Sequence, residues 1–460
     1  MEDFKQELDP TWYGQTVLHP YGLAAVILLG LIMIFLPRRY AIVPMIIMAC
    51  FISPAQRLVV ASLDFDMLRI MILFGWTRVV VRGEVRSIDW KWIDLLMIAM
   101  AIIGTIAYSA LFGTTSALTN RLGWAYELLG MYFLFRLLVR DWADMESAIV
   151  GFVVVSIPVA IFFAIELATK RNLFGLLGGV PTITQIRGGR LRCQGAFAHP
   201  ILAGCFYASL IPMMAALWWR DGRGRMLAVI GLACSGFVIL ACSSSTPLMA
   251  VVFVAVGFAM IVLRSRMGMV CLGLVVLTIA LDFAMNKPVY HLIARLNIFA
   301  SSTGWHRYNL IHQAVTHFGD WWLIGTRSTD HWGIYDITNQ YILIGLRGGF
   351  LTMMLFIGII VCAFRGVGRL WRLHADNRYR MIMSWALGVA LFTHVMSFIS
   401  VSYFGQIEMV WYLLLASIAS LSPTAQTLRA QQIARARSRQ QGMAMRHANV
   451  PHSAPAYPVR

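Results

Sequence analysis

Residues 147–168, SAIVGFVVVSIPVAIFFAIELA, contain a single charged side chain, Glu166. A helix that crosses the hydrocarbon core of a bilayer needs about 20 predominantly apolar residues, so this stretch predicts a membrane-spanning helix. Similar runs recur along the 460 residues, of which 59% are hydrophobic and 13% charged, with a mean hydropathy of +0.70. The sequence therefore predicts an all-α, polytopic transmembrane helical bundle of about 12–13 spans.

The apolar runs are separated by short, mostly Arg-rich stretches. Residues 1–421 are expected to form a single membrane domain. Residues 422–460 hold six arginines and no acid, which predicts a disordered or surface-lying arm attracted to anionic lipid. Spans are expected at 20–36, 41–53, 58–76, 93–113, 124–139, 147–168, 198–218, 226–242, 247–263, 268–285, 340–364, 380–400 and 406–421.

The basic connections indicate the orientation of the chain in the membrane. Lys and Arg gather in cytoplasmic loops, and simple alternation of the spans places the basic stretches 37–39, 78–91, 220–225, 264–266 and 365–380 on one side. That side is predicted to be the cytoplasm, with the tail inside and the acidic N-terminus outside. The leader lacks a basic region, so no secretory signal is indicated. Alternation leaves two external loops, 170–196 and 286–339, and the larger one is expected to contain short helices such as 303–318.

Several classes of protein are not indicated. The chain has no G-x-x-x-x-G-K-[ST] loop and no G-x-G-x-x-G after a strand, so no nucleotide site is visible. The seven cysteines are scattered without C-x-x-C pairs, which implies neither a disulfide framework nor a zinc site. We attribute the net charge of +17 to membrane topology rather than to nucleic-acid binding, and we expect no cofactor.

Both external loops are basic, although Lys and Arg are normally concentrated in cytoplasmic loops. Guanidinium groups bind phosphate oxygens in bidentate fashion, so these arginines predict an anionic ligand on the outer face, such as a lipid-linked pyrophosphate or a phospholipid. The alternative is that they extend from helix ends to lipid headgroups. The arginines are Arg187, Arg190, Arg192, Arg307 and Arg327, and the acids near them are Asp320, Asp330 and Asp336.

One segment resembles a known family signature. Arg192-Cys-Gln-Gly-Ala-Phe-Ala-His-Pro200 is similar to the Arg-x-x-Gly-x-Phe-x-x-Pro-Asn motif of the bacterial O-antigen ligase and O-antigen polymerase (Wzy-like) superfamily. The likeness covers roughly residues 187–365. It continues in order through a large external loop with Arg307 and Gly325, and a span that opens with Asn339-Gln340-Tyr341 and contains Gly345, Gly348 and Gly349.

The resemblance implies a metal-independent glycosyltransferase that acts on glycans carried by undecaprenyl pyrophosphate. It assigns Arg192 and Arg307 to the pyrophosphate. The family's candidate base, a His that precedes Asn, is here Thr338 before Asn339, and the final Asn of the signature is Ile201. These departures favour a polymerase or exopolysaccharide branch over a lipopolysaccharide ligase.

Other residues complete the expected site. His331, with Asp330 beside it, is the candidate base that replaces the missing His, because an adjacent carboxylate orients an imidazole. His199, before Pro200, is expected to make a structural hydrogen bond at a helix start. His306, His312 and His317 are spaced too widely to form a metal cluster. Arg187, Arg190 and Arg327 are additional pyrophosphate ligands, and Asn339, Trp332 and Tyr341 are candidate glycan contacts.

The function predicted is that of a bacterial inner-membrane polysaccharide polymerase for exopolysaccharide or O-antigen synthesis. It would join undecaprenyl-pyrophosphate-linked oligosaccharides on the periplasmic side, in the phospholipid bilayer and beside other polysaccharide-assembly proteins. Two alternatives stay open. One is a ligase that transfers glycan to another acceptor, and the other is a transporter or flippase of an anionic lipid-linked substrate, for which charges deep in the spans and a twofold helix repeat are expected.

Overall fold

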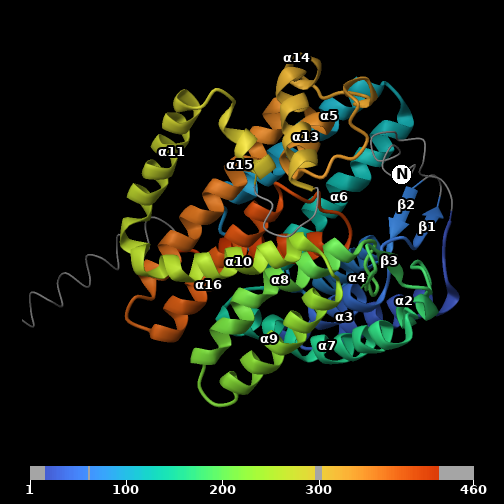
Figure 1. The fold of residues 1–460 in the computed structure, drawn as a ribbon. Coiled ribbons are helices and arrows are strands. Elements are labelled where there is room, and N and C mark those ends of the chain that lie inside the picture. Colours follow the sequence, from blue (N-terminus) through green and yellow to red (C-terminus); the bar gives the residue numbers. More distant parts are fainter. Residues whose placement is uncertain (1–15, 61–62, 296–302, 424–460) are drawn as a thin grey trace, which may run out of the picture.

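A computed structural model describes residues 16–60, 63–295 and 303–423, and it is an all-α polytopic bundle (Figure 1). Only two short hairpins of strands interrupt the helices in this part of the chain. Residues 1–15 and the basic arm after 423 lie outside the described residues, and so do the predictions made for them. The prediction of an all-α membrane bundle is confirmed.

Each of the thirteen expected apolar runs contains a helix. The bundle helices are α2 (Pro20–Phe35), α3 (Val43–Phe51), α4 (Met67–Val81), α5 (Trp92–Phe112), α6 (Thr115–Leu138), α7 (Trp142–Thr169), α8 (Pro200–Ala216), α9 (Gly224–Ala241), α10 (Ser245–Ala259), α11 (Met267–Ala284), α15 (Gln340–Leu373), α16 (Arg378–Ser397) and α17 (Gln406–Leu421). The short elements are η2 (Arg38–Tyr40), β1 (Arg57–Val60), β2 (Leu63–Asp66), η3 (Leu173–Leu177), β3 (Gln185–Arg187), β4 (Arg190–Arg192), η4 (Leu217–Trp219), η5 (Met260–Arg266), η6 (Val289–His291), α12 (Leu292–Arg295), α13 (Thr303–Thr316), α14 (Phe318–Trp321) and η7 (Asp330–Trp332).

Not every run spans a membrane by itself. Six helical stretches of the described chain are long and apolar enough to cross a bilayer, and α2 and α17 are shorter apolar helices. The expected span 58–76 is partly wrong, because its first residues form the β1–β2 hairpin and α4 begins only at Met67. The nine residues of α3 rise about 14 Å, roughly half the hydrocarbon thickness. The expected loop at 264–266 is also replaced, because η5 joins α10 and α11 into one helical stretch, Ser245–Ala284.

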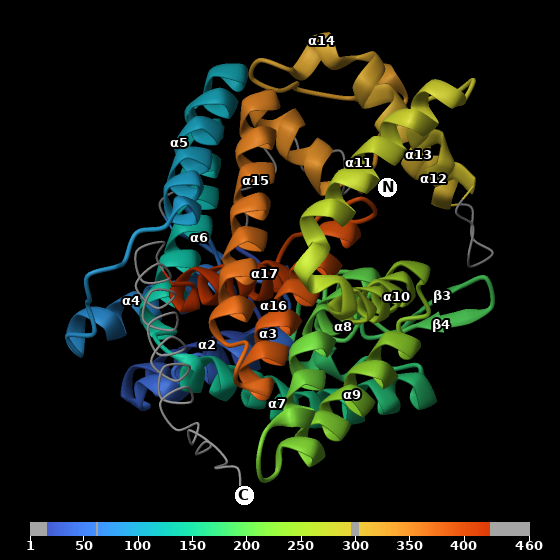
Figure 2. The same ribbon diagram turned by 90° about the vertical axis from the view of Figure 1, so that its left-hand side faces the viewer.

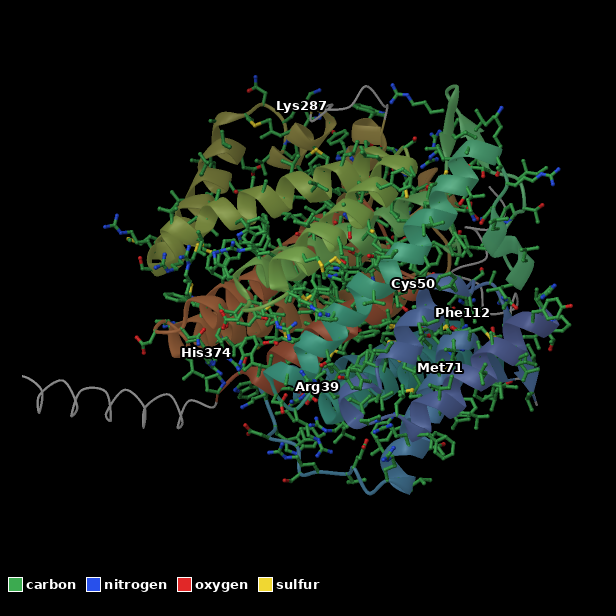
Figure 3. All side chains as sticks on the ribbon, turned by 90° about the horizontal axis from the view of Figure 1, so that it is seen from below. Arg39, Cys50, Met71, Phe112, Lys287 and His374 are labelled. Carbon is green, nitrogen blue, oxygen red and sulfur yellow. The ribbon has the colours of Figure 1, made fainter. Side chains whose placement is uncertain are left out.

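The basic connections meet at one end of the bundle, as alternation of the spans predicts. The start of α7 holds several of them together, because its acids and its Trp142 contact arginines from three other segments. Figure 3 shows two of the participants, Arg39 and His374, on the same side of the molecule. The contacts are Arg38–Asp144, Arg39–Ser147, Arg140 to the Glu84 carbonyl, Arg220–Glu146, Arg380 over Trp142 and His374 against Trp142.

The opposite end, which we call the outer end, holds both hairpins and the segments that precede α8 and α15. Gln406 at the start of α17 donates to the carbonyl oxygens of Ile52 and Ala196, and Gln56 donates to Leu177 O. These bonds tie segments that are up to 354 residues apart in the chain. The large loop reaches the same end, because Tyr403 N donates to Gln340 Oε1 directly after it and its Arg307 donates to Thr246 at the start of α10.

Helix α15 is broken where a segment of the large external loop packs into it. Gly349 has φ 79°, and a Cβ there would lie 2.2 Å from Leu323 O, so only glycine fits. The break allows Phe350 N to donate to Trp322 O at 2.7 Å and Thr326 N to donate to Leu346 O at 2.9 Å. The loop is thus hydrogen-bonded into the span, which fixes residues 321–326 against it.

Helix α11 stands apart from the other spans in Figure 1, and it lies on the side that faces the viewer in Figure 2. None of its residues is buried, although the helix is almost wholly apolar, with Leu272, Leu274 and Ile279 all more than half exposed. An exposed apolar helix of this length is stable in hydrocarbon rather than in water. Its surface supports the assignment to a membrane.

The orientation can be tested with single cysteines at the two ends. Ile186 on β3 is 59% exposed, and Asp221 is exposed in the α8–α9 connection. In a background with Cys271→Ala, we expect a membrane-impermeant maleimide to label Ile186→Cys in intact spheroplasts. Asp221→Cys should react only after lysis. The reverse pattern would place the outer end in the cytoplasm and contradict the predicted orientation.

Candidate functional site

Arg192 ends the second strand of a tight hairpin. Strands β3 and β4 pair with Arg187 opposite Arg190 and Gln185 opposite Arg192, and they are joined by two glycines. Side chains alternate along a strand, so Arg190 and Arg192 share a face at different depths. Arg190 is exposed at the tip, whereas Arg192 is only 5% exposed at the base of the hairpin.

The residues after Arg192 are held by a buried carboxylate. Glu166, at the end of α7, accepts from the backbone N–H groups of Gln194 and Gly195 at 3.2 Å each, and from the Thr184 hydroxyl at 3.0 Å. Gly195 has φ 58°, and a Cβ there would lie 2.4 Å from the Phe163 ring. The motif glycine is therefore required by backbone conformation and by space, and the segment is rigid because a paired buried carboxylate holds it.

The segment leads to a turn between α9 and α10, residues 242–246, which we call the serine turn. Cys193 N donates to Ala241 O at 3.1 Å, so the residue after Arg192 is bonded to the residue before the turn. Ser243 has φ 44°, an uncommon conformation for a residue other than glycine and one that often marks a functional site. The Ser244 side chain does not cap α10.

Arg307 reaches the same turn from the large external loop. It lies in the second turn of α13, and its Nη2 donates to Thr246 Oγ1 at 2.9 Å. Arg192 directly precedes Cys193, which is bonded to the residue before the turn, and Arg307 contacts Thr246, so both predicted arginines belong to segments attached to the α9–α10 connection. The N-terminal amides of α10 begin at this turn, and helix N-termini favour anions.

Three other arginines in the interior of the protein have carboxylate partners. Arg78 pairs with Glu84, Arg136 with Asp94 and Arg69 with Glu127. Over residues 16–60, 63–295 and 303–423, neither Arg192 nor Arg307 has an ion pair with a carboxylate, and the buried Nε of Arg192 has no hydrogen-bond partner. An uncompensated buried charge is costly, so this pair is suited to an external anion.

Burial changes the titration of groups at this site. Desolvation lowers the pKa of both guanidinium groups from the ordinary value, and Arg187 lowers that of Arg192 further, although arginine stays protonated at neutral pH. Burial, with Arg192 and Arg187 nearby, also lowers the pKa of His199 to about 4. His199 Nδ1 accepts from Ile201 N at 3.1 Å, so its expected structural hydrogen bond is confirmed and its ring is neutral at pH 7.

A second polar pair lies where α13 faces the segment before α15. Burial raises the pKa of Asp336, and His306, which directly precedes Arg307, partly offsets this. Asp336 Oδ1 and His306 Nε2 are both buried without a hydrogen-bond partner among the described residues. A partly buried carboxylate with a raised pKa in a candidate site is a candidate general base. Sequence reasoning treated Asp336 only as a neutralising charge, because its burial is not visible in the chain.

The other predicted arginines lie in two different places. Arg187 and Arg190 are exposed on the hairpin beside Arg192, where they add positive charge. Arg327 is placed elsewhere, because its Nε donates to Leu111 O at the end of α5. Arg187 and Arg190 therefore lie on the same hairpin as Arg192, whereas Arg327 is held at the end of α5, and the role of all of them as ligands of an anion stays a prediction.

The three predicted glycan contacts all make structural bonds. Asn339 caps α15 by accepting from Ile342 N, Tyr341 donates to Val395 O at 2.9 Å, and the Trp332 indole donates to Asp320. Asn339 and Trp332 are almost completely buried. A better platform for sugar rings lies on α13, where Tyr308 stacks on His312 with ring centroids 5.5 Å apart.

The arrangement around His331 differs from the prediction. His331 Nε2 contacts Asp320 at 3.1 Å, so the carboxylate that orients the ring is Asp320 and not the adjacent Asp330. His317, at the end of α13, approaches the same Asp320 oxygen at 3.4 Å. Residue 317 lies ten positions beyond Arg307, about 15 Å along a helix. His331 therefore does not gather at the serine turn, and its role as base stays a prediction.

No family model and no curated protein sequence matches this chain.

The lowered pKa of His199 has a consequence for stability. The folded ring takes up a proton only near pH 4, whereas the unfolded ring does so near pH 6.5, so the unfolded state gains protons first as the pH falls. The contribution of His199 to the free energy of unfolding is complete above pH 6.5 and declines towards pH 4. We expect the melting temperature to fall over this interval by more than in His199→Asn, which keeps a capping side chain. Parallel curves for the two proteins would contradict this assignment.

Proposed function

We propose that this protein is a membrane glycosyltransferase that polymerises oligosaccharides carried on undecaprenyl pyrophosphate. The observation that carries the proposal is the presence of two arginines without carboxylate partners among the described residues, Arg192 and Arg307, on segments that are both bonded to the α9–α10 connection. A pyrophosphate is a ligand of matching charge, and guanidinium groups bind its oxygens in pairs. The resemblance of residues 192–200 to the O-antigen ligase and polymerase signature supports the same assignment.

The reaction follows from this placement. An acceptor hydroxyl attacks the anomeric carbon of the donor sugar, the bond from that carbon to the pyrophosphate oxygen breaks, and undecaprenyl pyrophosphate leaves with the bonding electron pair. Arg192 and Arg307 stabilise the negative charge that grows on the leaving group, which is often the largest catalytic contribution. The donor carries its own activation, so neither a nucleotide nor a metal enters the proposed step.

The proton of the acceptor hydroxyl needs a base. We propose Asp336, which is half-buried and lies near His306, because a carboxylate with a raised pKa accepts a proton more readily. The base predicted from sequence, His331, is the competing candidate. The aromatic stack of Tyr308 and His312 provides a surface for the glycan on the same helix as Arg307.

An assay with purified protein in nanodiscs and the lipid-linked oligosaccharides of the source cells tests the proposal. Wild type should lengthen the lipid-linked glycan. Arg192→Ala and Arg307→Ala should each lower the rate by about 100-fold or more, as the loss of one charge-stabilising donor does. Arg171→Ala, an exposed arginine in the same external loop, is the matched control and should keep the wild-type rate. Asp336→Asn should lower the turnover rate and leave donor binding unchanged. If His331→Gln lowers the turnover rate and Asp336→Asn does not, His331 is the base instead.

Two other outcomes would replace the polymerase. Glycan transferred to a non-prenyl acceptor without lengthening would mean a ligase with the same arginine site. Labelled lipid that crosses the bilayer with its glycan unchanged would mean a transporter, and the assignment as an enzyme would be withdrawn. The transporter is a candidate because an ion pair, Arg69–Glu127, lies within the spans, where charged side chains are usually functional.

A further inference from the structure

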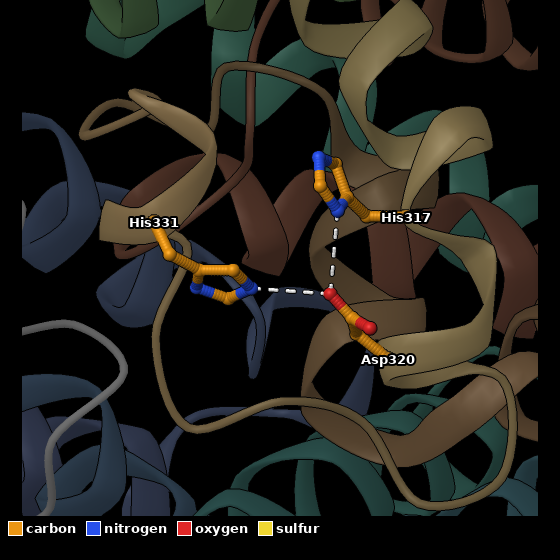
Figure 4. Close-up of side chains that lie close together, drawn as sticks. All are labelled: His317, Asp320 and His331. Carbon is orange, nitrogen blue, oxygen red and sulfur yellow. Dashed lines mark hydrogen bonds and ion pairs between the residues drawn. The ribbon is translucent and has the colours of Figure 1, made fainter.

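Three polar side chains of the large external loop converge at a point far from the serine turn. His317 follows α13, Asp320 lies in α14 and His331 lies in η7, and Figure 4 shows both rings pointing at one carboxylate oxygen. His317 Nδ1 lies 3.4 Å and His331 Nε2 lies 3.1 Å from Asp320 Oδ2. One ligand atom from each residue can be chosen so that all three lie within 4.8 Å of one another.

We propose that His317, Asp320 and His331 bind a divalent zinc-type ion. Two imidazole nitrogens and one carboxylate oxygen with an open fourth position form a known ligand set for Zn²⁺. With Zn–N and Zn–O bonds of about 2.0–2.2 Å, tetrahedral ligand atoms lie about 3.3 Å apart, and the two distances in the structure bracket this value. Mg²⁺ and Ca²⁺ prefer oxygen ligands, so two histidines favour a transition-metal ion.

The surroundings hold these ligands in position. The Trp332 indole N–H donates to Asp320 Oδ2 at 3.1 Å, and its ring stacks on His317 with centroids 5.1 Å apart and planes 11° apart. Such outer contacts orient metal ligands and raise affinity. The His317, Asp320 and His331 side chains are 33%, 43% and 54% exposed, so an ion from solution has access to them.

The bound ion would link two parts of the large external loop. It joins the end of α13 to η7 across the 321–326 segment that is hydrogen-bonded into the break of α15. The site is separate from the arginine site and does not rest on the proposed function. The plain alternative is that the three side chains form a hydrogen-bonded triad, which binds no metal.

Titration of the tag-free, chelator-stripped full-length protein in detergent with Zn²⁺ by calorimetry separates these possibilities. We expect one saturable site, and about 10- to 100-fold weaker binding or complete loss in His317→Ala, Asp320→Asn and His331→Gln. His312→Ala, on the same helix but outside the cluster, should bind as wild type does. Co²⁺ in place of Zn²⁺ should give the intense visible absorption of tetrahedral coordination.

Folding of each variant is checked by its melting temperature without metal. His331→Gln is the most informative variant, because its side chain is more than half exposed and its replacement should leave the fold intact. The metal site would be overturned if wild type showed no saturable binding of Zn²⁺. It would also be overturned if folded His317→Ala and His331→Gln bound Zn²⁺ with unchanged affinity.

Discussion

The organisation of the outer end depends on positive charge that the protein buries without a carboxylate. Removing a guanidinium from water costs several kcal/mol, by order of magnitude, unless a counter-charge compensates. Elsewhere the chain provides that compensation, as Asp94 does for Arg136 and Glu84 does for Arg78. At the serine turn the described residues offer Arg307 only a threonine hydroxyl, and Arg192 lies 5% exposed. An anionic ligand would supply the counter-charge that the protein does not provide.

The fold maintains this state through bonds that do not neutralise the arginines. Glu166 is close in sequence to the hairpin, yet its oxygens are directed to backbone N–H groups and to Thr184. Gln406 and Asn172 bind carbonyl oxygens of the same segment. The motif segment is thus held by several hydrogen bonds, and the oxygens of Glu166 are already occupied by them. Rigid positioning of charge before the substrate arrives is the condition for effective electrostatic stabilisation.

The helices were predictable from sequence, because long apolar runs leave few alternatives to a membrane helix. The hairpin at Arg57–Asp66 was missed because its apolar strand residues continue the run that leads into α4. The meeting of Arg192 and Arg307 followed only from the resemblance, since they are far apart in the chain. The pairing of His331 with Asp320 and the burial of Asp336 depend on the path of an irregular loop. No periodic pattern in the sequence encodes that path.

The central claim is that Arg192 and Arg307 hold one ligand together, and a double-mutant cycle on the equilibrium binding of undecaprenyl pyrophosphate tests it most directly. The affinities of wild type, Arg192→Ala, Arg307→Ala and the double variant are compared in nanodiscs. Two groups that bind the same pyrophosphate should be coupled, so the losses should differ from additivity by about 1 kcal/mol or more. Strictly additive losses, or binding that is unchanged in both single variants, would contradict a shared pyrophosphate site.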